Sequence, residues 1–99
     1  MSKNNNRGRP TVCLNMIIKN EGNIIYDTLK SLYQKIKFDH WVICDTGSTD
    51  NTIDELKRFF IETKHKGQFY KCEWVNFAHN RTEALALSRN KADYVLIFD

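Results

Sequence analysis

The stretch at residues 41–52, WVICDTGSTDNT, decides the fold of this 99-residue chain. Its first four residues, WVIC, form a short apolar run that is typical of a buried strand. The polar segment at 45–50, DTGSTD, has the composition of a turn. Thr52 and Glu55 then have the Thr-x-x-Glu spacing of a capping box, which predicts the start of a helix. The buried face of that helix is expected to contain Ile53, Leu56 and Phe60.

The same alternation of strand and helix extends outward in both directions. Apolar runs at 12–18 (VCLNMII), 69–75 (FYKCEWV) and 94–98 (YVLIF) predict three more strands. Between them, two further helices are predicted: one with Ile25, Leu29, Leu32, Tyr33 and Ile36 at helical spacing, and one capped by Asn80 and Glu83 that carries Ala84 and Leu87. Lys66 and Gly67 are expected to stop the middle helix. Four apolar strands alternating with three helices predict an α/β, Rossmann-like fold, a mostly parallel sheet with helices on both faces.

Composition excludes several classes of protein. Hydrophobic residues make up 41% of the chain and charged residues 27%, the balance of a globular domain, and no apolar run approaches the roughly 20 residues of a membrane span. Residues 1–10, MSKNNNRGRP, are polar and are predicted to be a disordered tail before a domain at 11–99. Three of the 15 basic residues lie in that tail, so the remaining 12 balance the 12 acidic residues and indicate no nucleic-acid partner.

Residues just after the strands are the candidate site, because ligands of parallel sheets bind beyond the carboxyl ends of the strands. These positions include Lys19, Asn20 and Glu21 after the first strand, Asp45 after the second and Asp99 after the fourth. If the second and fourth strands are neighbours, Asp45 and Asp99 would point into one crevice, where paired acids can hold a divalent cation or accept hydrogen bonds from a base and a ribose. The alternative for Asp45 is a structural one, capping the turn through Gly47.

Arg81 is placed by the predicted capping in the first turn of the third helix. A cation gains nothing there from the helix dipole, whereas an arginine beside exposed amide groups suits an anion such as a diphosphate. A surface salt bridge with Glu73 or Glu83 is the alternative that the sequence leaves open.

The tetrapeptide Asp-Thr-Gly-Ser at 45–48 is also the activating sequence of aspartic proteases, which work as dimers at about this length. That fold is nearly all β and rich in glycine, whereas this chain has four glycines and three helical patterns. A protease homodimer is therefore a remote alternative.

The three cysteines, Cys13, Cys44 and Cys72, lie in apolar stretches without CxxC spacing. This pattern indicates small core residues in a reducing compartment rather than disulfides or a zinc site. Together with the lack of a secretory leader, it predicts a cytoplasmic protein. The histidines are scattered and are expected to be surface residues.

Four blocks of the chain, taken together, resemble one family. They are MIIKNEGN at 16–23, ICDTGSTDNT at 43–52, WVNFAHNRTEAL at 74–85 and ADYVLIFD at 92–99. In this order and spacing they resemble family-2 glycosyltransferases with the GT-A fold, in the branch with a KNE turn and DTGSTD. The resemblance covers nearly the whole chain after residue 10.

The resemblance implies roles for the same positions. Lys19, Asn20, Glu21 and Asp45 would line the nucleoside pocket of a nucleotide-sugar donor, and Arg81 would lie near the nucleotide. Asp99 matches the first aspartate of the Asp-x-Asp motif that holds Mn²⁺ or Mg²⁺ on the donor diphosphate. Thr46 stands where the commoner DDGS form has a second acid, which weakens one contact to the base or ribose.

The sequence therefore predicts the donor-binding front part of a larger glycosyltransferase domain. Transfer to an acceptor (glycan, protein or lipid) would be metal-assisted and inverting, and the catalytic base is expected beyond residue 99, with no catalytic residue in this chain. The alternative is a non-catalytic remnant or nucleotide-binding module. Because the last strand is apolar and expected to be buried, the chain alone should expose a large apolar face.

Overall fold

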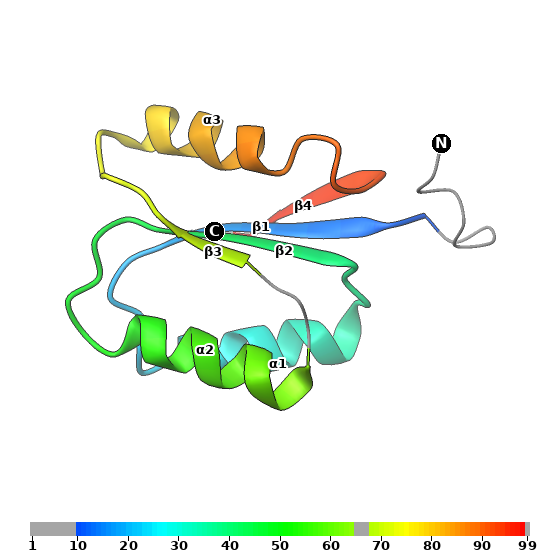
Figure 1. The fold of residues 1–99 in the computed structure, drawn as a ribbon, viewed down its shortest axis with the longest axis horizontal. Coiled ribbons are helices and arrows are strands. Elements are labelled where there is room, and N and C mark those ends of the chain that lie inside the picture. Colours follow the sequence, from blue (N-terminus) through cyan, green and yellow to red (C-terminus); the bar gives the residue numbers. More distant parts are fainter. Residues whose placement is uncertain (1–9, 65–67, 99) are drawn as a thin grey trace.

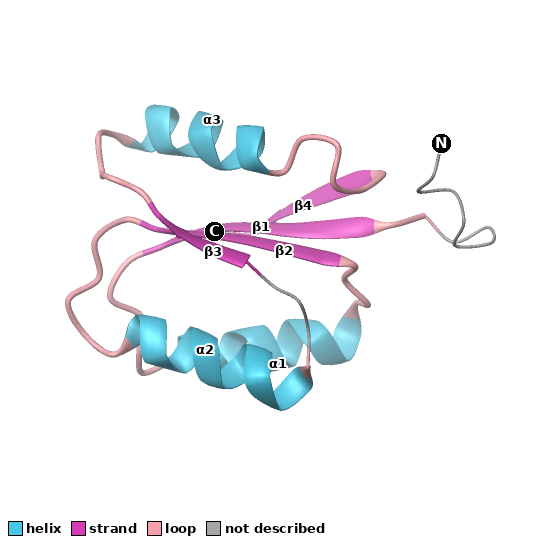
Figure 2. Cartoon of the chain, in the orientation of Figure 1, coloured by secondary structure: helices cyan, strands magenta, loops and turns pink. Residues whose placement is uncertain are grey.

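A computed structural model describes residues 10–64 and 68–98 of the chain. Four strands alternate with three helices, as Figures 1 and 2 show. In chain order these elements are β1 (Val12–Ile18), α1 (Ile25–Lys35), β2 (His40–Asp45), α2 (Thr52–Thr63), β3 (Gln68–Lys71), α3 (Phe77–Leu87) and β4 (Tyr94–Phe98). The predicted order and type of all seven elements are confirmed.

The strands form one sheet in the order β3-β2-β1-β4, and every neighbouring pair is parallel. Helices α1 and α2 cover one face of the sheet, and α3 covers the other (Figure 1). The predicted α/β, Rossmann-like sheet with helices on both faces is therefore confirmed, and the aspartic protease alternative is wrong because that fold is nearly all β.

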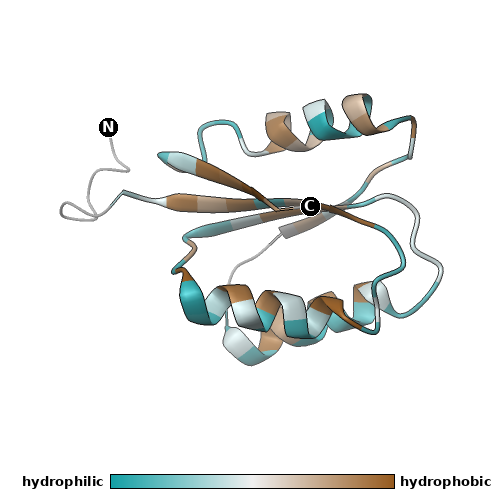
Figure 3. Ribbon diagram, turned by 180° about the vertical axis from the view of Figure 1, so that it is seen from behind, coloured by the Kyte–Doolittle hydropathy of each residue, from teal (hydrophilic) through white to brown (hydrophobic). Residues whose placement is uncertain are grey.

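Most of the hydrophobic core lies between the sheet and the α1–α2 pair. Figure 3 shows hydrophobic residues along the strands and on parts of the helices. Alternate residues of β1 and β2 point to this face and meet apolar residues spaced three or four apart on the two helices. The fully buried members of this cluster are Leu14, Met16, Ile18, Ile25, Leu29, Phe38, Trp41, Ile43, Leu56 and Phe59.

Strand β3 is shorter than the predicted run at 69–75. It ends at Lys71, whose Cα partner in the sheet is Asp45, the last residue of β2. One further bond joins the Cys72 N–H to the Asp45 carbonyl oxygen at 2.8 Å. Beyond this point no strand lies beside the chain, so residues 72–76 form a loop.

The predicted capping box of α2 is wrong. Asn51 is the N-cap residue, and its side chain makes no cap hydrogen bond. The Asp50 carboxylate instead accepts from the Thr52 backbone N–H at 2.9 Å and from the Thr52 hydroxyl. Glu55 pairs with Arg58 at 2.7 Å rather than with the helix start. The helix ends with Lys64 in the left-handed region at φ 57°, and the predicted stop at Lys66 and Gly67 lies outside the described residues.

The predicted start of α3 is also wrong. The helix begins four residues after Glu73, at Phe77, because the Asn76 side chain caps it by accepting from the His79 N–H at 2.8 Å. Asn80 is therefore inside the helix and fully buried. Arg81 consequently lies in the second turn, so the argument that placed it among the first exposed amide groups fails.

Strand β4 was expected to be buried, but it lies at an edge of the sheet. All five of its residues are exposed, from 36% for Leu96 and Phe98 to 62% for Tyr94. This confirms the expectation of an exposed apolar face. Strand β1 separates β4 from β2, so the condition under which Asp45 and Asp99 were expected to share one crevice is not met.

Candidate functional site

The loops that follow β1 and β2 are bonded to each other at one end of the sheet, where Figure 2 shows the connections into the helices. The Asn20 N–H donates to the Ser48 hydroxyl at 2.8 Å, and the Asn20 side-chain oxygen accepts from the Thr49 N–H at 2.7 Å. Asn20 adopts the left-handed conformation, φ 51°, which asparagine tolerates better than most residues. Asn20 therefore joins the two loops, and its side-chain oxygen is used for this loop–loop hydrogen bond.

A second set of bonds fixes the same two loops at the start of α2. The Glu21 N–H donates to the Thr52 hydroxyl at 2.9 Å, and the Gly22 N–H donates to the Asp50 carboxylate at 3.0 Å. Gly22 leaves room for this approach, because a Cβ would lie 1.9 Å from the Asn51 side-chain oxygen and 3.0 Å from the Thr52 nitrogen, so the Asn51 side chain would have to move. The backbone of the first loop is thus fixed to the second at Asn20, Glu21 and Gly22.

Asp45 is 3% exposed, and its carboxylate is engaged by the turn that follows it. One oxygen accepts from the backbone N–H of Gly47 at 3.3 Å and of Ser48 at 3.0 Å, and the other accepts from the Ser48 hydroxyl. The structural interpretation of Asp45 as a turn cap is therefore correct. Gly47 has φ 109°, a conformation that only glycine adopts readily.

Asp45 also borders a pocket, so its structural role does not remove it from the site. This pocket has a volume of about 320 Å³. Its charged lining comes from β2, from β3 and from the loop after β3. The lining residues are Asp45, Gly47, Ser48, Ile53, Lys71, Cys72 and Glu73.

A pocket of about 310 Å³ lies at the end of β1 and contains two of the predicted residues, Lys19 and Glu21. Two aromatic side chains, Trp74 and Phe77, form another part of its wall and are 49% and 56% exposed. Burial raises the pKa of the Glu21 carboxyl above its ordinary value. Thr46 also lines this pocket. The predicted residues Lys19 and Glu21 therefore share this pocket with an aromatic wall.

Thr46, which replaces the second acid of the commoner motif, has a structural role. It is 4% exposed, and both its backbone N–H and its hydroxyl donate to the Ile18 carbonyl oxygen, at 2.9 and 3.0 Å. These bonds continue the β1–β2 pairing by one residue and hold the two strand ends together.

Arg81 reaches the sheet from α3. Its Nη1 donates to the side-chain oxygen of Asn15 on β1 at 2.6 Å, and its guanidinium carbon lies 6.0 Å from the ring centroid of Phe77. The guanidinium therefore lies between the sheet and the aromatic wall of the pocket at the end of β1. Arg81 is thus linked to this pocket through Phe77, which lines it, although the position of Arg81 in the helix was predicted wrongly.

Three residues of this region were missed or misjudged from the sequence. Asn15 is fully buried in β1, and its position as a single polar residue in an apolar run is the signal that could have identified it. Asn80 is 1% exposed and holds the loop before α3, accepting from the Val75 N–H at 2.9 Å and donating to the Glu73 carbonyl oxygen at 3.0 Å. Trp74 belongs to that loop, which only the fold brings beside β1.

The cysteines match the prediction of core residues for Cys13 and Cys44, which are buried, whereas Cys72 is half-buried. All three are free thiols. Burial raises the pKa of the Cys44 thiol to about 12 and also raises the pKa of Cys72. Both thiols therefore stay protonated near neutral pH and are poor nucleophiles.

Metal ligands are not gathered within the described ranges 10–64 and 68–98, where no three histidine, cysteine or carboxylate side chains lie close enough to hold an ion. Asp99, the predicted metal ligand, lies outside the described residues. The part of the chain that the structure describes thus forms no complete metal site by itself.

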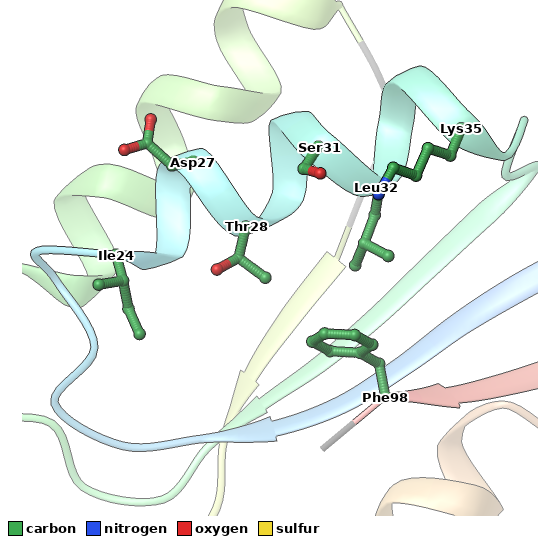
Figure 4. A pocket seen from close by; sticks show the side chains of 7 residues that line it. All are labelled: Ile24, Asp27, Thr28, Ser31, Leu32, Lys35 and Phe98. Atoms are coloured by element: carbon green, nitrogen blue, oxygen red, sulfur yellow. The ribbon is translucent and has the colours of Figure 1, made fainter.

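A third pocket, of about 430 Å³, lies between α1 and the exposed strand β4 (Figure 4). Phe98 points from the sheet toward Leu32, and the rest of the lining consists of Ile24 and polar residues of α1. This pocket contains none of the predicted site residues.

Among the helices of the described residues, none has the length and apolar character needed to cross a bilayer.

Comparisons with known proteins agree with the four sequence blocks. A family model described as glycosyl transferase family 2 matches residues 13–99. A similar solved structure is that of the mannosyltransferase PcManGT from Pyrobaculum calidifontis in complex with GDP-Man and Mn²⁺, with a TM-score of 0.68 and 24% sequence identity. The match covers 80% of this chain and 24% of that one, so this chain spans about a quarter of its relative's length. A search of curated proteins gave no match.

The fold and the family model point to the same conclusion by independent routes. The parallel four-stranded sheet, with helices on both faces, has the Rossmann-like arrangement of the GT-A fold. The family model covers almost all of the chain after the polar tail. The chain belongs to glycosyl transferase family 2.

Proposed function

We propose that this chain binds the nucleoside-diphosphate part of a sugar donor at the carboxyl ends of β1 and β2. The observation that supports this most strongly is the joining of the two loops after these strands. Two pockets border these loops, one lined by Lys19, Glu21 and Thr46 and the other by Asp45. Open α/β sheets bind ligands at this edge.

The side chains of this region suggest which groups would bind the base, the ribose and the diphosphate of the donor. Trp74 and Phe77 offer flat apolar surfaces on which a base can stack. Lys19 and Arg81 supply positive charge for a diphosphate, and Arg81 presents planar donors that suit phosphate oxygens. Glu21 and Asp45 are acceptors for the N–H groups of a base or the hydroxyls of a ribose.

A divalent cation, Mn²⁺ or Mg²⁺, is part of the proposal. PcManGT was solved with Mn²⁺ and GDP-Man, and Asp99 is the residue of this chain proposed to hold the ion. Oxygen ligands such as carboxylates suit both ions. Such an ion neutralises charge on the diphosphate as it leaves the sugar. The described residues do not complete the site, so the remaining ligands would come from elsewhere.

The proposal also includes sugar transfer with inversion to an acceptor, and both would need residues beyond those of this chain. No residue described here is assigned the role of base. The second candidate is a nucleotide-binding module that does not transfer sugar by itself. It is favoured because the chain spans about a quarter of PcManGT.

Calorimetric titration of the chain with UDP and with GDP tests the binding proposal. Binding of either nucleotide is expected with Mn²⁺ present, and EDTA should weaken it. Asp45→Asn and Lys19→Ala are each expected to weaken binding by about tenfold, since a hydrogen bond to a charged group contributes about 1.5–3 kcal/mol. Lys19 is exposed, so its variant should not disturb folding.

Asp54→Asn is the matched control, because Asp54 is an exposed acid in the first turn of α2 and lines neither pocket. It should bind as the original chain does. Unchanged affinity in both Asp45→Asn and Lys19→Ala would reject the proposed residues. Hydrolysis or transfer of a nucleotide-sugar by the chain alone would reject the non-catalytic module.

A further inference from the structure

Asn15 is a buried amide in the middle of β1, and its exposed fraction is zero. It faces α3, where its Nδ2 donates to the Ala84 carbonyl oxygen at 2.9 Å and to the Ser88 hydroxyl oxygen. A buried amide costs free energy unless its hydrogen-bonding groups find partners. Both Nδ2 hydrogens have partners on α3 and at its C-cap, so the amide is held at one end.

The orientation of this amide follows from its partners. The Ala84 carbonyl oxygen only accepts hydrogen bonds, so the nitrogen of Asn15 must face it. The side-chain oxygen of Asn15 therefore points the other way, toward Arg81, and accepts from Nη1 at 2.6 Å. A guanidinium only donates, so this pairing has no workable flipped alternative.

Arg81 is thereby connected to the proposed donor site. Its guanidinium carbon lies 6.0 Å from the centre of the Phe77 ring, and Phe77 lines the pocket at the end of β1 together with Lys19 and Glu21. Because the guanidinium is planar and rigid, fixing Nη1 against a buried amide restricts the direction of the whole group.

We propose that Asn15 is a positioning residue that holds the Arg81 guanidinium in the orientation that binds the donor nucleotide. This rests on the proposed function of the site, because Asn15 is fully buried and would act on a ligand only through Arg81. An arginine side chain loses rotamer freedom when a ligand orders it, and this loss opposes binding. Asn15 orders it before the ligand arrives, and the nucleotide then binds more tightly.

The affinity test is a double-variant cycle with GDP and UDP in the presence of Mn²⁺. Asn15→Val is expected to weaken nucleotide binding by about tenfold in the original chain and by less than about twofold in the Arg81→Ala background. Asn15→Ser, too short to reach Arg81, serves if the valine variant does not fold. Equal weakening in both backgrounds, or none in the original chain, would overturn the proposal.

Ser88→Ala is the matched control. It removes one buried partner of the same amide, while the Ala84 carbonyl still holds Asn15 against Arg81. It should lower thermal stability and leave affinity within about twofold. A purely structural role for Asn15 predicts instead that Ser88→Ala and Asn15→Val lose affinity in proportion to stability.

NMR relaxation of the Arg81 Nε–H group separates this inference from the proposed function, because it needs no ligand. Fast motion of that group is expected to increase in Asn15→Val and not in Ser88→Ala. Unchanged motion in Asn15→Val would overturn the positioning role even if nucleotides bind. Increased motion in Asn15→Val, combined with full nucleotide affinity in Arg81→Ala, would support the positioning role of Asn15 and reject a contact between Arg81 and the nucleotide.

Discussion

The two faces of the sheet differ in what they bury. Under α1 and α2 lies the larger buried apolar cluster, in which the rings of Phe38 and Phe59 lie 5.0 and 5.3 Å from that of Trp41. Under α3 the buried cluster is small and contains Cys13, Val42, Cys44 and Ala84, with Asn15 and Ser88 beside it. Aromatic burial dominates one face, and hydrogen bonding has a larger share on the other.

This difference separates stability from function within one small sheet. Apolar burial is non-directional and scales with area, so the α1–α2 face contributes most of the folding free energy. Hydrogen bonds are directional, so the α3 face can hold Arg81 and the loop before α3 in defined positions. The proposed donor site lies at the end of the sheet where the two faces meet.

The largest effect is expected from Phe59→Ala on the α1–α2 face. Phe59 is fully buried, and its ring lies 5.3 Å from that of Trp41 and 6.2 Å from that of Tyr26. Removing it should lower the free energy of unfolding by about 3–5 kcal/mol, measured by urea denaturation. Ile61→Ala on the same helix is the control, since Ile61 is 75% exposed and its loss should change stability by about 0.5 kcal/mol or less. Similar losses in the two variants would contradict the assignment of the core to this face.

An intermediate effect is expected from Asn80→Ala on the α3 face. This change leaves the Val75 N–H and the Glu73 carbonyl oxygen without their buried partner. The free energy of unfolding should fall by about 1–3 kcal/mol in the same urea experiment. Thr82→Ala, an exposed position of the same helix, is the control. A loss no greater than that control would show that hydrogen bonds do not hold this face.

The smallest effects are expected at the edge between the faces, where two acids should change stability in opposite directions with pH. The hydrogen bond from the Thr52 side chain holds the pKa of the Asp50 carboxyl below its ordinary value, whereas burial raises the pKa of Glu21. A lowered pKa stabilises the fold above the ordinary value, and this stability is lost as pH falls through the folded-state pKa. A raised pKa in an acid does the reverse, costing stability at neutral pH and restoring it as pH falls.

Thermal unfolding of two variants between pH 2 and 7 checks this contrast. Asp50→Asn should be less stable than the original chain at pH 7, with the difference vanishing at acid pH. Glu21→Gln should be more stable at pH 7, with the difference fading as pH falls through the raised pKa toward about 4.3. Differences of the same sign would contradict the assigned environments.

Local pattern was sufficient for the elements and their order. The apolar runs at 12–18 and 94–98 match β1 and β4 in both bounds, because continuous apolar segments flanked by polar turns leave few other choices. Helix starts were predicted less well, because several residues near each start can serve as caps. Asn76 and Asn80 are four residues apart and chemically identical, and only the loop from β3 decides which one caps α3.

The site divides in the same way. Lys19, Glu21 and Asp45 follow apolar runs in the sequence, and parallel strands bring their carboxyl ends to one edge, so the position of these residues at that edge could be predicted without coordinates. The order of strands could not, because it depends on which faces pack together. That order separates β4 from β2, places Trp74 beside β1 and brings Arg81 onto Asn15, 66 positions away. Such contacts arise from the packing of whole elements, which no local pattern encodes.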